Sequence, residues 1–345
     1  MKGTSILFPA ALLFLITACQ KHPEKAEKKA AAPLPSVIAF GSCSNQYLPQ
    51  PLWDDIRADH PDLWIWLGDN IYGDSYVMDT LRKKYQRAKM NPGYAALRAQ
   101  TKIIGVWDDH DYGLNDGGRE YPRKDSSKTL LLDFLDIPEE AAVRSHPGVY
   151  QSFLFGEGAQ KLKVILLDTR YFRDSLTPST RPGRRYEQNE SGDMLGEAQW
   201  QWLESELAAN DAAVTLLGSS IQVLHEEHGW EKWDNLPKAR QRLFDLIRKY
   251  KPRNLLILSG DRHIAEMARM DLEGYGPLYE ITSSGLTHTW SSGKSEANKY
   301  RVDENLIIHK NYGLIRIDWS GAQPALRVEI KGDKGVVYGS WDLQR

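Results

Sequence analysis

The chain has 345 residues, of which 41% are hydrophobic and 26% are charged, and its formal net charge is −2. This is the composition of a globular protein that could hold two domains or one large α/β domain. The near-neutral charge carries no nucleic-acid-binding signature.

The amino terminus predicts an export signal. Lys2 precedes an apolar run over residues 6–16, which is too short to span a bilayer and suits a secretory signal. The run ends in Ile16-Thr17-Ala18-Cys19, which resembles the lipobox of bacterial lipoproteins. That resemblance implies a lipoprotein signal peptide over 1–18, cleaved before a lipidated Cys19. The alternative is a plain signal peptide with a chance cysteine.

Residues 19–36 predict a flexible linker, because they are rich in Lys, Glu, Ala and Pro without any apolar period. The folded domain is expected over 37–345. We therefore expect an exported protein that a lipid anchor holds on a membrane. Gln20 rather than Asp follows the cysteine. This favours the outer membrane, facing the periplasm or the cell surface, if the host has two membranes.

Short apolar runs that end in polar loops recur along the chain. They cover residues 37–40, 63–67, 103–107 and 255–258 and predict buried strands. The loops that follow supply carboxylates, imidazoles, a phenol and a thiol. Open α/β sheets bind ligands beyond the carboxyl ends of their strands. The loops therefore predict one crevice, and their side chains predict metal-site chemistry.

Other segments complete an α/β (α+β) pattern. Further strands are predicted over 162–167, 214–217, 279–282, 312–317, 325–330 and 336–338, and helices over 79–97, 127–135, 195–209 and 236–250. Early strands alternate with helices, whereas the last strands follow one another closely. This favours a mixed sheet or a two-sheet sandwich flanked by helices. The polar loop 174–193 is of a length typical of functional lids or disordered segments.

Cys43 follows the first predicted strand. The sequence holds only two cysteines, so lipidation of Cys19 would leave Cys43 as a lone thiol in an oxidising compartment. A buried, inert cysteine is the alternative. The position of Cys43 at a strand end favours metal ligation.

The loops stand in the order found in binuclear metallophosphatases, which carry an aspartate loop, a GD-x-x-D or GD-x-x-Y loop, a GNH-(E/D) loop and a late GH-x-H. This chain has Gly68-Asp69-x-x-Tyr72, Asp108-Asp109-His110-Asp111 and Gly260-Asp261-x-His263. Cys43 stands where the first aspartate is usual, Asp109 replaces an asparagine, and Asp261 replaces a histidine.

These departures are shared with one branch of the superfamily. From about Val37 to at least His288 the chain resembles the PhoD-like (alkaline phosphatase D) family. The matching segments are GSCS at 41–44, LGDNIYGD at 67–74, WDDHDYG-x-ND at 107–116, LDTR at 167–170 and SGDRH at 259–263. The resemblance implies a metallophosphatase-type four-layer αββα sandwich, with two mixed sheets flanked by helices.

Two metal sites are expected. Asp69 is the natural bridging carboxylate. Thiolate, phenolate and imidazole from Cys43, Tyr72 and His263 suit a trivalent or soft ion, although Tyr72 has the alternative of packing beside the crevice. Asp69, Asp109 and Asp261 form an all-oxygen site that suits Ca²⁺ or Mg²⁺ better than Zn²⁺. The resemblance implies Fe³⁺ with Ca²⁺, in a binuclear or larger cluster, and allows other divalent metals.

His110 is the expected catalytic residue. It lacks an obvious ligand role, and in the superfamily this histidine faces the phosphate, so we expect it to stabilise the transition state or protonate the leaving group. Further candidates for substrate binding are Asn70, Asn115, Asp116 and His288.

Other polar residues are expected to be structural. Asp108 is predicted to form a turn or to lie behind the ligands. Asp168 and Arg170 are predicted to form a buried ion pair, although an arginine at a strand end could bind phosphate. His225 and His228 are expected at the surface.

The predicted activity is hydrolysis of phosphoric mono- or diesters outside the cytoplasm, because two metals can clamp the attacking and leaving oxygens while activating water. One alternative is a phospholipase-like hydrolase, since the tether would hold the crevice near lipid headgroups. Another is a non-catalytic lipoprotein that binds metal or phosphate. The partner is thus a small-molecule or lipid phosphoester. Its choice depends on loops 117–128, 174–193 and 226–235, whose Arg and Trp content allows an anionic ligand that stacks on aromatic rings.

Overall fold

The structure is a computed structural model that describes Met1, Gly3 and residues 32–292, 296–304 and 306–343. It divides into Met1–Ala30 and Ala31–Arg345, and the described helices and strands all belong to the second unit. The predicted signal peptide beyond Gly3, Cys19 and linker residues up to 31 lie outside the described residues. Within the described part of the chain, no helix combines the length and the apolar character that crossing a membrane requires.

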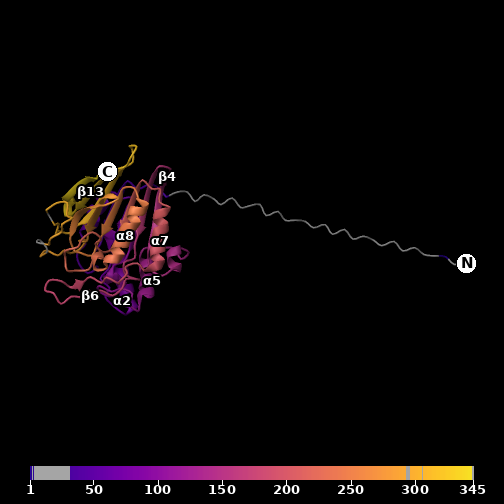
Figure 1. Ribbon diagram of the computed structural model, residues 1–345, viewed down its shortest axis with the longest axis horizontal. Coiled ribbons are helices and arrows are strands. Elements are labelled where there is room, and N and C mark those ends of the chain that lie inside the picture. The colour runs from indigo at the N-terminus through magenta and orange to yellow at the C-terminus, as the bar shows by residue number, and fades with distance from the viewer. Residues whose placement is uncertain (2, 4–31, 293–295, 305, 344–345) are drawn as a thin grey trace. The chain divides into compact units, whose positions relative to one another are not determined.

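Two six-stranded mixed sheets form the centre of the unit Ala31–Arg345 (Figure 1). The first has the order β14-β13-β12-β1-β2-β3. Its strands β1, β2 and β3 are parallel, and β12, β13 and β14 continue the sheet in antiparallel pairs. The bounds are β1 (Val37–Gly41), β2 (Leu63–Leu67), β3 (Lys102–Val106), β12 (Tyr312–Asp318), β13 (Ala325–Lys331) and β14 (Val337–Leu343).

The second sheet has the order β10-β11-β9-β8-β5-β4. Its four inner strands are parallel, and both edge strands are antiparallel to their neighbours. The bounds are β4 (Gln151–Glu157), β5 (Gln160–Leu166), β8 (Val214–Gly218), β9 (Leu255–Ser259), β10 (Ala265–Leu272) and β11 (Gly276–Ser283). Within loop 174–193, a small ribbon pairs β6 (Thr177–Pro178) with β7 (Tyr186–Glu187).

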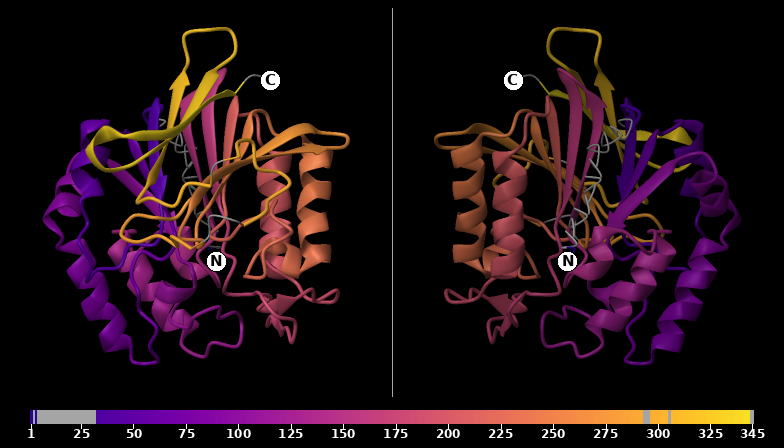
Figure 2. Two further views of the ribbon diagram at one scale, coloured as in Figure 1. Left: turned by 90° about the vertical axis from the view of Figure 1, so that its left-hand side faces the viewer. Right: turned by 90° about the vertical axis from the view of Figure 1, so that its right-hand side faces the viewer.

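Helices cover the outer faces of both sheets. Figure 2 shows α7 and α8 on one side of the strands and the early helices on the other. The predicted αββα sandwich is therefore confirmed. The bounds are α1 (Leu52–Ala58), α2 (Met78–Lys89), α3 (Pro92–Arg98), α4 (Asp109–Tyr112), α5 (Lys124–Phe134), α6 (Ala142–Ser145), α7 (Gly196–Ala208), α8 (Pro237–Tyr250), and the 3₁₀ turns η1 (Trp233–Asn235) and η3 (Asp333–Gly335).

The single helix predicted over 79–97 is wrong, because the chain forms α2 and α3 with a break between them. The Asn91 side chain accepts the backbone N–H groups of Gly93 and Tyr94, and Pro92 occupies the first turn of α3. Both features start a helix rather than continue one.

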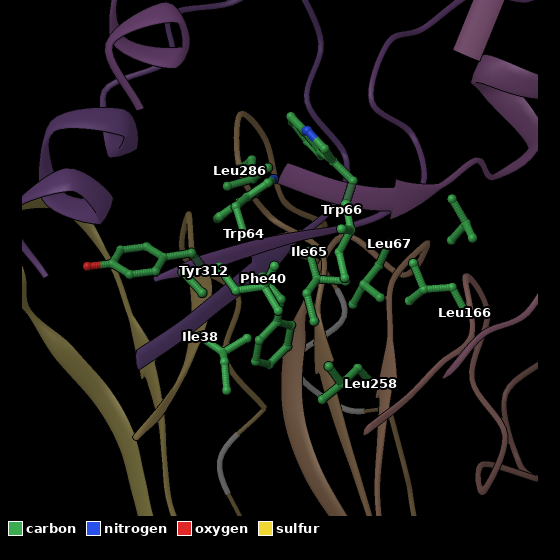
Figure 3. Packing of buried hydrophobic residues seen from close by; sticks show 14 of the residues in the cluster. Ile38, Phe40, Trp64, Ile65, Trp66, Leu67, Leu166, Leu258, Leu286 and Tyr312 are labelled. Atoms are coloured by element: carbon green, nitrogen blue, oxygen red, sulfur yellow. The ribbon is translucent and has the colours of Figure 1, made fainter. Parts of the chain in front are cut away.

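Alternation along the central strands explains the layers. Leu216 and Leu258 belong to the core between the sheets, whereas Leu217 and Ile257 pack in the cluster under α7 and α8. Figure 3 shows the same rule in β2, where Leu67 lies toward Leu258 of the second sheet. A strand buried on both faces must be apolar throughout, which is why these runs were visible in the sequence.

Residues 32–36, predicted as the end of the linker, already contact the folded unit. Ala32 bridges Phe155, and its carbonyl accepts the N–H of Gly156 at 3.0 Å. The carbonyl of Ser36 accepts the N–H of Ile317 at 2.8 Å. These contacts lie at the amino-terminal ends of β1 and β5.

Candidate metal centre

The predicted loops converge at the carboxyl ends of β1, β2, β3 and β9. Several of their residues have left-handed backbones, with φ values of 62° at Cys43, 50° at Asp69, 66° at Asp261 and 54° at His263. Non-glycine residues rarely adopt this conformation, which persists only where the surroundings enforce it and which clusters at functional sites.

One group of metal donors gathers around Cys43. Ligand atoms of Cys43, Asp69 and His263 all lie within 4.8 Å of one another. Cys43 Sγ is 3.5 Å from Asp69 Oδ2, and the hydroxyl of Tyr72 is 2.8 Å from His263 Nε2. The tertiary structure thus brings together the thiol, carboxyl, phenol and imidazole of the predicted iron site.

Carboxylates form the adjoining part of the centre. Asp69 recurs in a group with Asp109 and His110, and Asp109 recurs in a group with Asp108 and Asp261, again with ligand atoms within 4.8 Å. Asp69 thus belongs to both donor groups, as expected of a carboxylate that lies between two ions. Asp108 does cap helix α4, as a turn former would, but its place in the second carboxylate group makes it a further candidate ligand.

This donor set fits cations. Burial, followed by repulsion from neighbouring carboxylates such as Asp109, raises the pKa of Asp261 well above its usual range. Burial and then the charge of Asp69 likewise raise the pKa of the Cys43 thiol. The buried Asp108 Oδ2 and Asn70 Oδ1 have no hydrogen-bond partner. Bound cations would offset the repulsion and favour thiolate, and the two unpartnered oxygens are donors of the kind that hard cations prefer.

His110 differs from these donors in its partner. Its Nδ1 lies 2.8 Å from both carboxylate oxygens of Asp74. Burial opposes protonation of the ring, but the charges of Asp109 and Asp69 and the bond to Asp74 outweigh it and raise the pKa to about 11. Asp74 is not among the predicted site residues, although it is the last residue of the LGDNIYGD segment.

The pKa of His263 is shifted in the opposite direction to that of His110. Burial, together with the neighbouring His288 and His110, lowers its pKa to about 3. The imidazole is therefore neutral, which is the form that binds metals. His288 lies beside it, with ring centroids 4.4 Å apart.

The side-chain nitrogen of Asn70 is engaged within the protein. Its amide donates to the carbonyl of Val106 at 2.9 Å and to Asp111 at 2.6 Å. The backbone N–H of Asp116 donates to Asp109 Oδ2 at 2.6 Å. Both residues therefore hold neighbouring groups of the centre.

A pocket of about 210 Å³ opens over the carboxylates. Arg185 from loop 174–193 and Trp230 from loop 226–235 reach this pocket, so two of the three loops expected to govern specificity do line it. Arg262 and Trp290 were not predicted, and Arg262 stands inside the SGDRH segment. The lining comprises Asp109, His110, Asn115, Asp116, Arg185, Trp230, Glu231, Asp261, Arg262, His263 and Trp290.

The predicted ion pair between Asp168 and Arg170 is wrong. Asp168 Oδ1 accepts the N–H groups of Arg170 and Tyr171 in its own turn, both at 2.9 Å. Its carboxylate also accepts the indole N–H of Trp107 and the backbone N–H of Val149, each at 2.9 Å. The fully buried guanidinium of Arg170 pairs instead with Asp108 and Glu231, each at 2.6 Å.

His225 and His228 are buried, so the expectation that they lie at the surface is wrong as well. Each Nδ1 accepts the backbone N–H of the residue two positions later, Glu227 and Trp230 respectively, at 3.1 Å. Local turn hydrogen bonds therefore engage one nitrogen of each ring, and His228 Nε2 also lies 3.0 Å from Gln222 Oε1.

Comparisons with known proteins find similar sequences and structures. The family model of the PhoD-like phosphatases matches residues 38–322. Alkaline phosphatase D of Bacillus subtilis (strain 168) is 23% identical over 321 residues, which cover 79% of this chain and 54% of that protein. The chain thus spans about half the length of this relative.

Solved structures share the fold. A structure of PhoD aligns with a TM-score of 0.68 at 17% identity, covering 91% of this chain and 72% of that one. GAP50, described as the anchor in the inner membrane complex of Plasmodium, aligns with a TM-score of 0.58 at 12% identity, covering 90% and 89%.

We predict that Arg170→Gln lowers the free energy of unfolding by about 3–5 kcal/mol, because it leaves Asp108 and Glu231 buried without their cation. Urea unfolding in the presence of a chelator would measure this effect apart from metal binding. As a matched control, Arg82→Gln removes an exposed guanidinium that pairs with Asp79, and the unfolding midpoint should hardly move. Equal midpoints for both variants would contradict the prediction.

Proposed function

The chain belongs to the PhoD-like phosphatase family, and from this premise we propose that it is a metal-dependent phosphoesterase that acts outside the cytoplasm. The observation that carries the proposal is the convergence of thiol, phenol, imidazole and carboxylate donors at one strand-end crevice beside His110. The fold by itself would not suffice, because GAP50 shares it and is named as an anchor.

The donor chemistry supports a division into two sites. Cys43, Tyr72 and His263 would hold Fe³⁺, with Asp69 as the bridge. Asp109 and Asp261, joined by Asp69 and Asp108, would hold Ca²⁺ through oxygen alone. When bound, the ions would supply positive charge for the phosphate oxygens. They would also lower the pKa of a water molecule, so that hydroxide is available to attack phosphorus.

His110 has the geometry of a proton donor. Asp74 engages Nδ1, which leaves Nε2 as the ring nitrogen that can serve the leaving-group oxygen. A carboxylate on the opposite nitrogen orients the ring and stabilises its protonated form. Arg185 and Arg262 contribute cationic side chains to the same pocket and would attract the anionic ester.

The position of Ala32, near the start of the folded unit, does not support the phospholipase-like alternative. Ala32 contacts Phe155 beside the β4–β5 turn, at the end of the strands opposite the pocket. The described start of the folded unit therefore lies away from the pocket. We therefore propose substrates that reach the pocket from solution.

We predict that His110→Ala lowers kcat about 10²–10⁴-fold on benzyl methyl phosphate, whose alcohol needs a proton to leave, while both metals stay bound. Asp74→Asn should lower kcat less, about 10–100-fold. Because it removes a carboxylate that raises the pKa of His110, the alkaline limb of the pH profile should move to lower pH.

Asp79→Asn, an exposed change on α2, serves as the control. Metal loss in His110→Ala would make His110 a ligand instead, and a metal-replete protein inactive on mono- and diesters would favour a binding role.

The metal proposal has a spectroscopic test. Phenolate and thiolate bound to Fe³⁺ give charge-transfer absorption in the visible range, which Zn²⁺ cannot produce because its d-shell is filled. Tyr72→Phe should shift or remove the band, and Cys43→Ala should weaken iron retention. A calcium chelator should abolish activity, and added Ca²⁺ should restore it. A colourless protein that is fully active with zinc alone would contradict this assignment.

We also propose that the mature chain begins at a lipidated Cys19, on the lipobox resemblance described above. The protein should then partition with membranes, and mass spectrometry should find a diacylglycerol-modified amino-terminal cysteine. Cys19→Ser should abolish both properties. An unmodified amino terminus at another residue would refute the anchor and leave the enzymatic proposal standing.

A further inference from the structure

Two hollows meet at a pair of tryptophans. Trp230 and Trp290 line the pocket over the metal centre and also line a second hollow of about 320 Å³. Their ring centroids lie 6.0 Å apart at an interplanar angle of 80°. Trp230 retains 40% of its exposure, which is unusual for so large an apolar side chain. Any group that extends from the centre into the second hollow passes these two indoles.

The position of Trp230 is built into the fold. The carbonyl of Gly229 accepts the N–H groups of Arg185 and Tyr186 at 2.8 and 3.2 Å, which ties loop 226–235 to loop 174–193. A Cβ at Gly229 would lie 2.3 Å from the carbonyl oxygen of Gly183, so only glycine fits there. The backbone of Trp230 also donates to buried His228. The indole is therefore presented by a fixed turn.

The charged side chains beside the indoles are paired with one another. The guanidinium of Arg262 lies 5.7 Å from the ring centroid of Trp290 and pairs with Glu296 at 2.7 Å. Arg262 and Glu296 therefore compensate each other's charge, and exposed Glu227 lies at the rim of the second hollow. A flat, uncharged ring can stack on the exposed indole of Trp230 without a charged partner.

We propose that Trp230 and Trp290 form the leaving-group subsite of the enzyme, and that it selects phosphoesters whose alcohol carries a flat, uncharged aromatic group. This inference rests on the proposed phosphoesterase activity. An aryl ring and a nucleobase share the required chemistry, because both offer a π-face for the indoles.

Three methyl phosphodiesters distinguish a subsite for an aromatic alcohol from one for an aliphatic or a cationic alcohol. Benzyl and cyclohexylmethyl methyl phosphate have alcohols of similar size and acidity and differ in aromaticity. The choline ester, 2-(trimethylammonio)ethyl methyl phosphate, adds a cation. Using the metal-replete protein, we expect kcat/KM for release of the larger alcohol to favour benzyl over cyclohexylmethyl roughly five- to tenfold. A nucleoside 5′-(methyl phosphate) then tests whether a nucleobase is accepted as well.

The variants test the assignment to Trp230. Trp230→Leu should reduce the benzyl preference to about one, and Trp230→Phe should retain most of it. Trp202→Leu, which changes an indole of α7 that lines neither hollow, is the matched control and should keep the preference. Circular dichroism checks the fold of each variant.

The outcomes that overturn the inference are distinct. Hydrolysis of all esters without an aromatic preference would defeat the subsite and leave the proposed function intact. A preference for the choline ester that Trp230→Leu abolishes would make the two indoles a cation site instead. Failure to hydrolyse any ester would defeat the proposed function itself and the subsite with it.

Discussion

The centre depends on one electrostatic constraint, the crowding of buried carboxylates at the strand ends. Asp69, Asp108 and Asp261 all have their pKa values raised, first by burial and then by one another or by Asp109. Such an arrangement is unfavourable by itself, and it persists only where cations offset the repulsion. This constraint connects the fold, the buried Arg170 and the proposed metal ions.

The protein supplies part of the compensating charge. Asp109 is the exception among these aspartates, because His110, Arg170 and the N–H of Asp116 outweigh its burial and lower its pKa. Arg170 joins Asp108 to Glu231, which lines the pocket. The remaining donors, including the unpartnered Asp108 Oδ2, are left for ions. The same acidity that binds metals would repel a phosphate, so phosphate binding would depend on the metals, Arg185 and Arg262.

Different parts of the fold position the metal donors and line the substrate pocket. Rigid strands buried on both faces hold the donors, whereas Arg185 and Trp230 come from loops that are joined through Gly229. Substitutions in these loops can alter the choice of ester without disturbing the ligands.

The sequence by itself determined the layers and most of the donors. Strands buried on both faces must be continuously apolar, and ligands must follow them, so Asp69, Asp109 and His263 were visible from local pattern and motif order. Only the tertiary structure decided the partners of these residues. Asp74 meets His110 across 36 positions and Arg170 meets Asp108 across 62. Asp168 likewise accepts the indole N–H of Trp107 across 61 positions, in addition to the N–H groups of its own turn. Local patterns report burial and periodicity, but a contact between distant side chains depends on how strand ends and loops converge in space.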